Sequence, residues 1–590
     1  MPLRPLLSRL LTPLRTRRAE ALRAAYPEET AAWAVAPAVA VCGNPAFGDY
    51  QCNNAMPLFQ RLKAAGSKDA GSPRAVAERL LAALPASPMV AGTSIAGPGF
   101  INVTLSRPWL AQRLSGLLTH GAGSWAPPVP GGRRRAVVDF SSPNIAKEMH
   151  VGHLRSTILG DTLCRCLEFS GAEVLRLNHV GDWGTQFGML IEHLADQQGG
   201  AEGASVGDLQ AFYKASKKRF DEDAAFKARA QAAVVRLQAG SPEARAAWAR
   251  ICAVSRAEFD ALYARLGVTL TERGESFYND LIPARLEELA AKGVSTLSEG
   301  AQCVFTPGTT TPLIVRKSDG GFNYASTDLA ALWHRVHTER ADWLVYVTDS
   351  GQSSHFAQVF EAARAAGWLP PDGSVRVDHV GFGLVMGDDG KRFRTRSSDT
   401  VRLADLLDEA RERCLAQMRE RGGREDLSEA ELQQAAEAMG YSAVKYADLN
   451  QNRATNYVFS FDRMLDLKGN TAVYLLYAHA RINSIVRKAG LNPAAAGAPI
   501  ALEAPEEAAL GLAISRFPEA VEATVAELMP NRLTDYLYDL SAKFNEFYGA
   551  CTVIGSEQQA SRLQLCEATA VVMRKCFDLL GINYGPLMRL

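Results

Sequence analysis

Two histidines that bracket a glycine, His150 and His153 around Gly152, form the most informative pattern in the chain. They lie between a predicted strand over residues 136–140 and a predicted helix over residues 154–167, whose apolar residues recur at helical intervals. A turn between a strand and a helix presents backbone N–H groups and the positive end of the helix dipole to an anion. The imidazoles add hydrogen-bond donors for phosphate oxygens, so the pattern suits a nucleotide triphosphate. Taken alone, the same pattern is equally consistent with a chance pair of structural histidines.

A second segment, residues 388–397, places four cations in a loop after a strand-like stretch over residues 382–386. By itself such a loop is more often a solvated surface. Together with the histidine turn, a basic loop that contains Thr395 and Ser397 resembles the adenylate-forming site of class I aminoacyl-tRNA synthetases. The combination therefore favours an enzyme that activates an amino acid with ATP.

The segments around the histidine turn predict a parallel sheet. Strands are expected at residues 136–140, 174–177 and 343–347, with a helix between the first two. A strand, a helix and a strand within about 45 residues indicate a βαβ unit with a right-handed crossover. A helical insertion over residues 205–290 is expected to divide the sheet into two halves.

Three domains are predicted along the chain. Residues 1–120 favour a small α+β domain, with a helix around residues 76–84 and a strand over residues 100–105. The Pro- and Gly-rich stretch 126–132 is the best linker in the sequence. From residue 402 onward strands are expected to disappear in favour of helices.

The predicted fold class is therefore a multidomain α/β protein. A Rossmann-like catalytic domain with a helical insertion spans residues 131–420, and a helical bundle spans residues 421–590.

Length and composition exclude several classes of protein. The 590 residues are 47% hydrophobic and 22% charged, close to the globular average, which argues against wholesale disorder and fibrous repeats. Lys and Arg number 64 and Asp and Glu also number 64, so net charge does not indicate a nucleic-acid partner. Ten cysteines without a Cys-x-x-Cys pair argue against a zinc knuckle or a disulfide framework. No apolar run is long enough to cross a membrane.

The first 19 residues hold arginines at positions 4, 9, 15, 17 and 18 and no acid before Glu20. This composition favours a basic first helix of the opening domain and is also compatible with an organellar transit peptide. We therefore expect a cytoplasmic protein, with an organellar location after removal of this segment as the alternative.

Motifs over almost the whole chain resemble those of the arginyl-tRNA synthetases. They are Ser-Pro-Asn-Ile-Ala-Lys at 142–147, His-Val-Gly-His-Leu-Arg-Ser-Thr at 150–157, Asn-His-Val-Gly-Asp-Trp-Gly-Thr-Gln-Phe-Gly at 178–188, Arg-Gly-Glu-Ser-Phe-Tyr at 273–278, Thr-Arg-Ser at 395–397, Gly-Asn-Thr-Ala at 469–472, Tyr-Ala-His-Ala-Arg at 477–481 and Ala-Gly-Pro-Gly-Phe-Ile-Asn at 96–102.

The resemblance implies two reaction steps. L-Arginine and ATP, with Mg²⁺, form arginyl-adenylate and pyrophosphate, and the arginyl group then passes to the 2′-hydroxyl of the terminal adenosine of tRNA(Arg). It also implies a monomer that needs tRNA before it activates arginine. The family often ends in Pro-Glu-Arg-Met, whereas this chain ends at residues 586–590 in Pro-Leu-Met-Arg-Leu, which leaves the docking of the C-terminus open.

The family's mobile loop usually reads Lys-Met-Ser-Lys-Ser, but here Thr395 takes the place of the second lysine. Many arginyl enzymes share this departure and are thought to use the lysine just before the histidine motif, which is Lys147 here. The alternative for this lysine is a solvent-facing side chain. The catalytic residues implied by the resemblance are His150, His153, Lys147, Arg394 and Arg396, and the implied ATP-binding residues are His150, Gly152, His153, Lys147 and Thr395.

A pocket for arginine must meet a planar guanidinium with carboxylates and with aromatic or amide partners. By motif, Asp328 and Tyr324 are expected at the guanidinium. Asn144 and Gln352 are expected to hold the α-amino and carboxylate groups, with Asp139 nearby. The alternative role for Asp328 is to cap the helix that follows it.

Two regions are expected to bind tRNA. The C-terminal helices resemble an anticodon-binding bundle, in which aromatic rings stack on splayed bases and cations hold phosphates. The N-terminal domain resembles one that touches the corner of tRNA. Because aromatic residues at helical spacing usually pack in a core, about half of the aromatic candidates are expected to be structural. The implied tRNA-binding residues are Phe100, Asn102, Tyr477, Arg481, Asn545 and Tyr548.

Two rival interpretations stay open at the level of sequence. A class I transferase for another amino acid or acceptor would keep the histidines but would lack the helical bundle and the acidic pocket. A catalytically silent tRNA-binding protein would not need His150, His153, Lys147 and Asp328, all of which are present.

Overall fold

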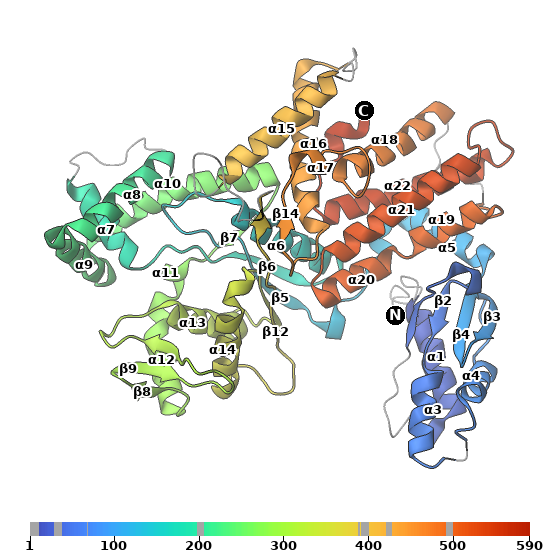
Figure 1. The fold of residues 1–590 in the computed structure, drawn as a ribbon, viewed down its shortest axis with the longest axis horizontal. Coiled ribbons are helices and arrows are strands. Elements are labelled where there is room, and N and C mark those ends of the chain that lie inside the picture. The colour runs from blue at the N-terminus through green and yellow to red at the C-terminus, as the bar shows by residue number, and fades with distance from the viewer. Residues whose placement is uncertain are drawn as a thin grey trace.

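The computed structural model describes residues 11–28, 38–67, 69–196, 206–387, 390, 401–420, 427–490 and 499–589. Three regions follow one another along the chain: a small sheet domain, a central parallel sheet with helices, and a helical bundle (Figure 1). None of the described helices combines the length and the apolar character that crossing a bilayer requires.

The first region is an antiparallel sheet with helices packed on it. Its strands lie in the order β1-β2-β4-β3, and each neighbouring pair is antiparallel. Leu58 and Leu62 of one helix and Val76 and Leu80 of another recur at helical spacing and are buried. The elements are α1 (Leu11–Ala25), β1 (Val39–Val41), η1 (Pro45–Phe47), β2 (Tyr50–Cys52), α3 (Ala55–Ala64), α4 (Pro73–Ala82), β3 (Val90–Ala96) and β4 (Phe100–Leu105). The predicted strand at residues 100–105 and the predicted helix near residues 76–84 are therefore confirmed.

The basic N-terminal segment is helical where the structure describes it. Leu22 and Ala25 of α1 are buried, and Arg17 donates to the carbonyl of Ala86 at 2.8 Å. The chain then passes through α5 (Arg107–His120), η2 (Ala122–Trp125) and η3 (Pro130–Gly132) toward the central sheet.

Five parallel strands form the central sheet, in the order β12-β11-β5-β6-β7. The three strands expected from sequence are β5 (Arg135–Asp139), β6 (Glu173–Asn178) and β11 (Trp343–Tyr346), and the outer strands are β7 (Thr271–Glu272) and β12 (Arg376–His379). The chain leaves β5 through α6 (Val151–Phe169) to reach β6, and it later returns to the opposite side of β5 through β11. The strand order thus reverses beside β5, and open α/β sheets bind ligands beyond the carboxyl ends of their strands at such a point.

Alternate residues of the central strands face two separate cores, as the period of a strand requires. Val138 and Val345 pack in the core that includes α6, and Val137 and Leu344 pack in the core on the opposite face. That second core is formed with α12 (Ile282–Ala291), α13 (Tyr324–His337) and α14 (Ser353–Ala365). The sheet is therefore covered by helices on both faces.

Between β6 and β7 the described residues form four helices, α7 (Thr185–Asp196), α8 (Val206–Glu222), α9 (Ala224–Gln238) and α10 (Pro242–Leu266). The expectation of helices alone over residues 205–290 is incomplete, because β7 returns to the sheet at residue 271. After α11 (Glu275–Tyr278), η4 (Asn279–Leu281) and α12, a three-stranded antiparallel sheet follows that the sequence did not predict. Its strands are β8 (Thr296–Ser298), β9 (Ala301–Val304) and β10 (Leu313–Arg316).

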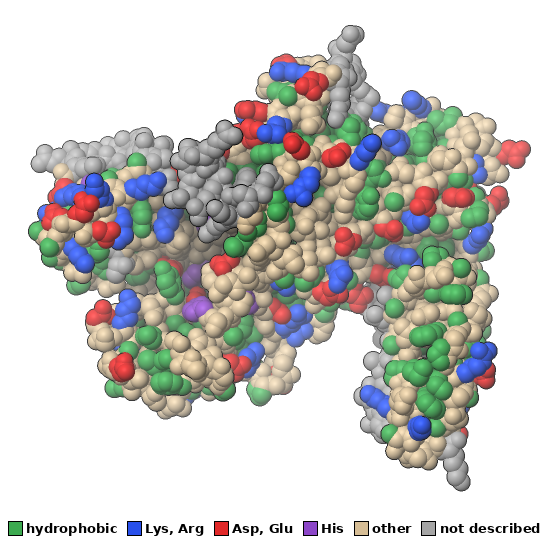
Figure 2. Space-filling view, in the orientation of Figure 1, with side chains coloured by type: hydrophobic (Ala, Val, Ile, Leu, Met, Phe, Trp, Pro, Cys, Tyr) green, Lys and Arg blue, Asp and Glu red, His purple; other side chains and the backbone are tan. Residues whose placement is uncertain are grey.

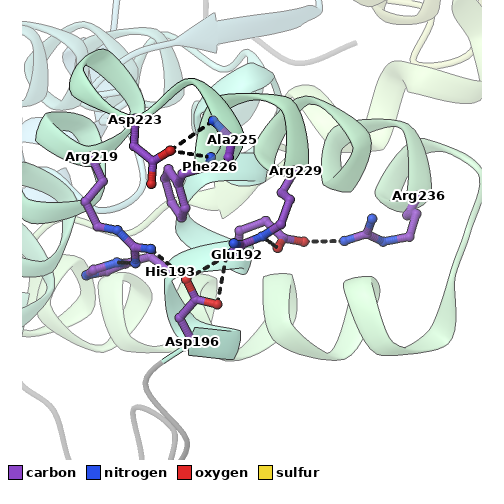
Figure 3. Close-up of polar contacts among 9 residues, drawn as sticks. All are labelled: Glu192, His193, Asp196, Arg219, Asp223, Ala225, Phe226, Arg229 and Arg236. Atoms are coloured by element: carbon purple, nitrogen blue, oxygen red, sulfur yellow. Dashed lines mark hydrogen bonds and ion pairs between the residues drawn. The ribbon is translucent and has the colours of Figure 1, made fainter.

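Charged side chains hold α7, α8 and α9 together (Figure 3). Glu192 binds Arg229 and Arg236, and Asp196 binds Arg219 and Arg229. The pairs are partly exposed, so each contributes at most about 1 kcal/mol. Shared partners make them a network, which fixes the three helices relative to one another.

Helices dominate the last region of the chain. Strands were expected to be absent beyond residue 402, and this is wrong at one point: β14 (Tyr457–Val458) pairs with β13 (Val385–Met386) in parallel. Each of these strands has only two residues, which is too few for an alternating sequence pattern to reveal it. The other described elements of this region are α15 (Leu403–Glu420), α16 (Glu429–Leu449), α17 (Phe461–Met464), α18 (Ala472–Ala489), α19 (Pro505–Ser515), α20 (Phe517–Glu527), α21 (Asn531–Ala550), α22 (Gln559–Leu579) and η6 (Gly585–Arg589). The short η5 (Ser350–Gln352) lies earlier, between β11 and α14.

Candidate functional site

The histidine turn lies at the carboxyl edge of the central sheet, beside the point where the strand order reverses. β5 ends at Asp139 and β11 ends at Tyr346, and α6 starts at Val151 after the loop that follows β5. Figure 2 shows this face hollowed between helices α7–α10 and helices α12–α14, with histidine side chains at the floor of the hollow.

His150 and His153 cap the first turn of α6. The backbone N–H of Gly152 donates to Nδ1 of His150 at 3.0 Å, and the backbone N–H of His150 donates to Nδ1 of His153 at 3.1 Å. Because Nδ1 accepts in both rings, each neutral imidazole carries its proton on Nε2. The ring centroids are 4.1 Å apart. The turn therefore places both imidazoles beside the positive end of a helix of 19 residues.

The loop from β5 to α6 contains backbone conformations that are unusual for residues with side chains. Ser141, Ser142 and Ala146 have φ angles of 72°, 46° and 62°. A left-handed conformation costs such residues roughly 1–2 kcal/mol each. Strain of this kind persists only where the surroundings enforce it, and it concentrates at functional sites.

Asn144, expected to hold the substrate's amino or carboxylate group, lies in this loop against Gly181. The two residues form a parallel bridge, in which the N–H of Gly181 donates to Pro143 and the N–H of Ile145 donates to Gly181. A Cβ atom on residue 181 would lie 2.2 Å from Oδ1 of Asn144. Glycine at residue 181 is thus what lets the Asn144 side chain take this position.

Asp139, expected near the arginine, is paired within the protein. Its Oδ2 lies 2.7 Å from Nη2 of Arg335, and its Oδ1 accepts a hydrogen bond from Oγ of Ser142 at 2.9 Å. Arg335 comes from α13, is 1% exposed, and lies 5.0 Å from the ring of Tyr346. Both carboxylate oxygens of Asp139 are engaged, so this residue is suited to fixing the loop.

Asp328 lies in the second turn of α13 and faces two histidines from other elements. Its Oδ2 is 2.6 Å from Nε2 of His355, and its Oδ1 is 4.0 Å from Nε2 of His179. The alternative role of Asp328 as a helix cap is wrong, because Asn323 caps α13 through its side chain. Tyr324, at the start of the same helix, is 73% exposed.

Gln352 lies beyond β11, in η5, where its amide donates to Asp349 Oδ2 at 3.3 Å. This places Gln352 at the same edge of the sheet as the histidine turn. Its side chain is exposed.

Glu275 is a site residue that sequence reasoning did not single out. Burial, and then the neighbouring carboxylates Asp328 and Asp182, raise the pKa of Glu275 to about 8. Asp182 is itself buried and accepts hydrogen bonds from the backbone and hydroxyl of Ser276 at 2.8 and 2.6 Å. Acidic groups from separate elements therefore converge at one edge of the sheet.

His179 and Glu275 carried a signal in the sequence. Each lies just past the carboxyl end of a parallel strand, β6 or β7, and each belongs to a motif block shared with the family. His355, on α14, carried no such signal.

Lys147 is exposed, and its Nζ lies 5.8 Å from the ring centre of Tyr213 on α8. The lysine is therefore exposed to solvent and lies beside the insertion helix α8. The expected basic-loop residues Arg394, Thr395 and Arg396 lie outside the described residues.

Three of the residues expected to bind tRNA meet at one pocket on the bundle. Arg481 donates to Oδ1 of Asn545 at 3.2 Å, and the amide of Asn545 donates to the hydroxyl of Tyr474 at 2.6 Å. The pocket has a volume of about 380 Å³ and is lined by Leu467, Tyr474, Tyr477, Ala478, Arg481 and Asn545. Its aromatic walls, cation and amide match what an unstacked base requires.

The other three candidates have different environments. Tyr548 is 45% exposed and stacks on Phe544 with ring centroids 6.1 Å apart. Phe100 is 38% exposed at the start of β4, whereas Asn102 is 1% exposed and accepts from the amide of Gln51 at 2.9 Å. Because Asn102 is buried and bonded to Gln51 of β2, in this conformation it supports the sheet and leaves Phe100 as the exposed residue of the motif.

Models of three protein families match successive parts of the chain. They are the N-terminal domain of arginyl-tRNA synthetase over residues 14–105, the catalytic domain of class I tRNA synthetases (R) over residues 120–461, and the DALR anticodon-binding domain over residues 475–588.

Curated relatives are similar over most of their length. A chloroplastic/mitochondrial arginine–tRNA ligase of Arabidopsis thaliana is 57% identical, in an alignment that covers 95% of this chain and 88% of the relative. A cytoplasmic arginine–tRNA ligase from the same plant is 58% identical, and the alignment covers 91% of this chain and 92% of the relative. Among solved structures, the arginyl-tRNA synthetase of Plasmodium falciparum superposes with a TM-score of 0.84 at 32% identity, covering 97% of this chain and 98% of its own. That of Thermus thermophilus has a TM-score of 0.80 at 25% identity, covering 98% and 100%.

Proposed function

Because this chain belongs to the class I arginyl-tRNA synthetases, which join L-arginine to tRNA with ATP, we propose a division of labour along its sheet edge. The histidine turn binds the triphosphate, the acidic groups of α11 and α13 bind the guanidinium, and the bundle binds tRNA. The observation that carries this proposal is the convergence of Glu275 and Asp328 at the edge that also holds His150 and His153.

At the phosphate end, Nε2–H groups of His150 and His153 stabilise charge on the α-phosphate as the arginine carboxylate attacks it and pyrophosphate leaves. Lys147 swings from Tyr213 toward the phosphates, and Arg394 and Arg396 assist from the basic loop, with Thr395 beside them. Gly152 leaves room for the phosphate. No protein nucleophile is needed, so positioning and charge neutralisation supply the rate.

Mg²⁺ accompanies ATP in this proposal. In the described ranges, no group of three or more His, Cys, Asp or Glu side chains is placed to hold a metal ion. Mg²⁺ keeps several waters and commonly binds through substrate phosphates, so the phosphates of ATP would supply its main ligands.

At the arginine end, the carboxylates of Asp328 and Glu275 meet the guanidinium, and the exposed ring of Tyr324 closes over it. Asn144 and Gln352 hold the α-amino and carboxylate groups. Asp139 acts indirectly, because its ion pair with Arg335 keeps the loop that carries Asn144 in place.

At the tRNA end, the pocket between α18 and α21 receives a base of the anticodon loop, with Tyr477, Arg481 and Asn545 as its contacts. Tyr548 stacks nearby, and Phe100 contacts the corner of tRNA from the N-terminal domain. Asn102 does not contact tRNA itself but holds β4, the strand that carries Phe100, against β2.

We further propose that activation of arginine requires bound tRNA. The test is ATP–pyrophosphate exchange with each of the twenty amino acids, with and without total tRNA. Exchange with arginine alone, and only after tRNA is added, is the expected result. Vigorous exchange without tRNA would overturn the requirement, and exchange with another amino acid would overturn the assignment of the acidic pocket.

The remaining proposals concern organisation and setting. The three parts are residues 1–120, 131–420 and 421–590. The packing of α15 on α16 and the pairing of β13 with β14 cross the second boundary and couple the two parts. We propose a cytoplasmic monomer, with a location in an organelle as the alternative because relatives of both kinds exist.

A further inference from the structure

We propose that the Tyr263 hydroxyl of α10 is a positioning group for adenylate formation, which holds the strained loop that leads into His150 and His153. The proposal rests on the roles given to the two histidines. It assigns a function to a helix of the insertion, which lies outside the βαβ unit that carries them.

The first strained residue of the loop is Ser141, at the end of β5. The N–H of Ser142 donates to the carbonyl of Phe140 at 3.1 Å, so Ser141 is the central residue of a three-residue γ-turn with φ of 72°. A γ-turn with positive φ is rare and strained. Ser141 is only 4% exposed, so water cannot stabilise this conformation and side chains must do so.

Tyr263 supplies such a contact. Its hydroxyl shares a hydrogen bond of 2.8 Å with Oγ of Ser141 and accepts a second from the amide of Asn178 at 3.2 Å. The same Asn178 accepts from the backbone N–H of Ser142 at 3.0 Å. Tyr263 is 5% exposed, and burial raises its pKa to about 12, so it stays a neutral hydrogen-bonding group. One hydroxyl thus ties the γ-turn to the end of the neighbouring strand β6.

Hydrogen bonds continue from this hydroxyl to a catalytic histidine. Oγ1 of Thr157 lies 2.9 Å from Oγ of Ser141 and 2.6 Å from the carbonyl oxygen of His153. Tyr263, Ser141, Thr157 and His153 therefore form one chain of contacts. A displacement of Ser141 would be passed to the first turn of α6, where the imidazoles face the phosphate.

Ser255 provides a second contact from the same helix. Its hydroxyl accepts from the backbone N–H of Ala146, another strained residue, at 3.0 Å, and Ser255 is fully buried. Residues 255 and 263 are about two turns apart and therefore lie on one face of α10. Trp248, about two turns earlier on that face, donates to the carbonyl of Asp182 at 2.7 Å. This face of α10 therefore forms three hydrogen bonds to the loops that follow β5 and β6, through Tyr263, Ser255 and Trp248.

The test is the variant Tyr263→Phe, which removes only the hydroxyl. Its kcat for tRNA-dependent ATP–pyrophosphate exchange should fall about 10–100-fold, because sub-ångström to ångström displacements of catalytic groups have such effects. The KM values for ATP and arginine should change little, since the histidines act in the transition state. The matched control is Tyr441→Phe, which removes a hydroxyl that accepts from Arg265 of the same helix at 3.0 Å. The control should keep full kcat.

A double variant separates positioning from general loss of structure. In the His153→Ala background, Tyr263→Phe should lower kcat much less than in the wild type, because the group that it positions is gone. Equal fold-losses in both backgrounds, or full kcat in Tyr263→Phe, would overturn the proposal. His153→Ala with full kcat would instead overturn the role given to that histidine. If Tyr263→Phe does not fold, Ser255→Ala takes its place with the same criteria, and Ser541→Ala, a buried helical serine in the bundle, is its control.

Discussion

Arginine should bind more tightly as the pH rises toward and through the pKa of Glu275. Burial and the carboxylates Asp328 and Asp182 raise this pKa to about 8 in the unliganded enzyme. At neutral pH the Glu275 carboxyl is therefore mostly protonated. A guanidinium needs the ionised form, so arginine binding must release this proton.

The magnitude follows from the pKa. With a pKa near 8, about one molecule in ten is ionised at pH 7, so arginine should bind about tenfold more weakly at pH 7 than above pH 9. Below pH 8 the affinity should change by up to about tenfold per pH unit, and above pH 9 it should level off. Binding at pH 7 should release about 0.9 proton per arginine.

The same shift has the opposite effect on folding. A carboxyl whose pKa is raised on folding from the ordinary 4.5 to about 8 stabilises the native state below pH 4.5, and this contribution is lost as the pH rises toward 8. Glu275→Gln removes the ionisable group. The variant should therefore have a higher Tm than the wild type above pH 8, although it binds arginine more weakly there.

The assay is titration calorimetry with arginine, at saturating tRNA and without ATP, in two buffers of different ionisation enthalpy. Glu275→Gln should show no proton release and a flat affinity from pH 6.5 to 9. The exposed Glu287 of α12, changed to Gln, should behave as the wild type. Wild-type affinity that stays constant over this pH range, with no proton released at pH 7, would refute the reasoning.

Three further predictions concern other parts of the molecule. His150→Ala should lower kcat for exchange by about 10²–10³-fold with little change in the KM for ATP, and a purely higher KM would contradict the role of this residue. Asp448→Asn leaves the fully buried Arg155 without its counter-ion at 3.0 Å, so urea unfolding should show a loss of about 3 kcal/mol; an unchanged midpoint would contradict this. Arg481→Ala should raise the KM for tRNA in aminoacylation, while kcat at saturating tRNA stays the same. An unchanged KM for tRNA would show that the pocket lined by Arg481 does not bind tRNA.

The sequence predicted the elements whose patterns are local. Strand β5, the loop and α6 follow one another within a single βαβ unit, so apolar spacing and the histidine motif were sufficient to place them. The sheet β8–β10 and the strand β14 were missed, because strands of two to four residues show no readable alternation. Strand β11 is equally short, but it was recognised from its continuous apolar run. Asn102 was expected to bind tRNA because it lies in a motif that resembles the family's, but it is 1% exposed and accepts a hydrogen bond from Gln51 of a neighbouring strand, a pairing between strands that the motif does not display.

Candidate site residues divide in the same way. Asp139, His179 and Glu275 each lie at or just past the carboxyl end of a parallel strand, so the topology alone brings them to one edge. The charged side chains that pair with the candidate site residues come from helices that are distant in the sequence. Arg335 reaches Asp139 from α13, and His355 reaches Asp328 from α14. Such pairings depend on how helices pack, which a single sequence does not display.

Another long-range pairing, between Arg155 and Asp448, gives the proposed tRNA requirement a physical route. Arg155 lies five residues after His150 in α6, or about 7.5 Å along the helix axis. Its guanidinium is fully buried and binds Asp448 of α16 at 3.0 Å, and it also donates to the carbonyls of Gly383 and Thr455 at 2.6 and 3.3 Å. A buried charge cannot lose these partners cheaply, so α6 and α16 must move together. Any shift of α16 that tRNA causes in the bundle would therefore be transmitted to the helix whose first turn holds His150 and His153, the histidines proposed to be catalytic.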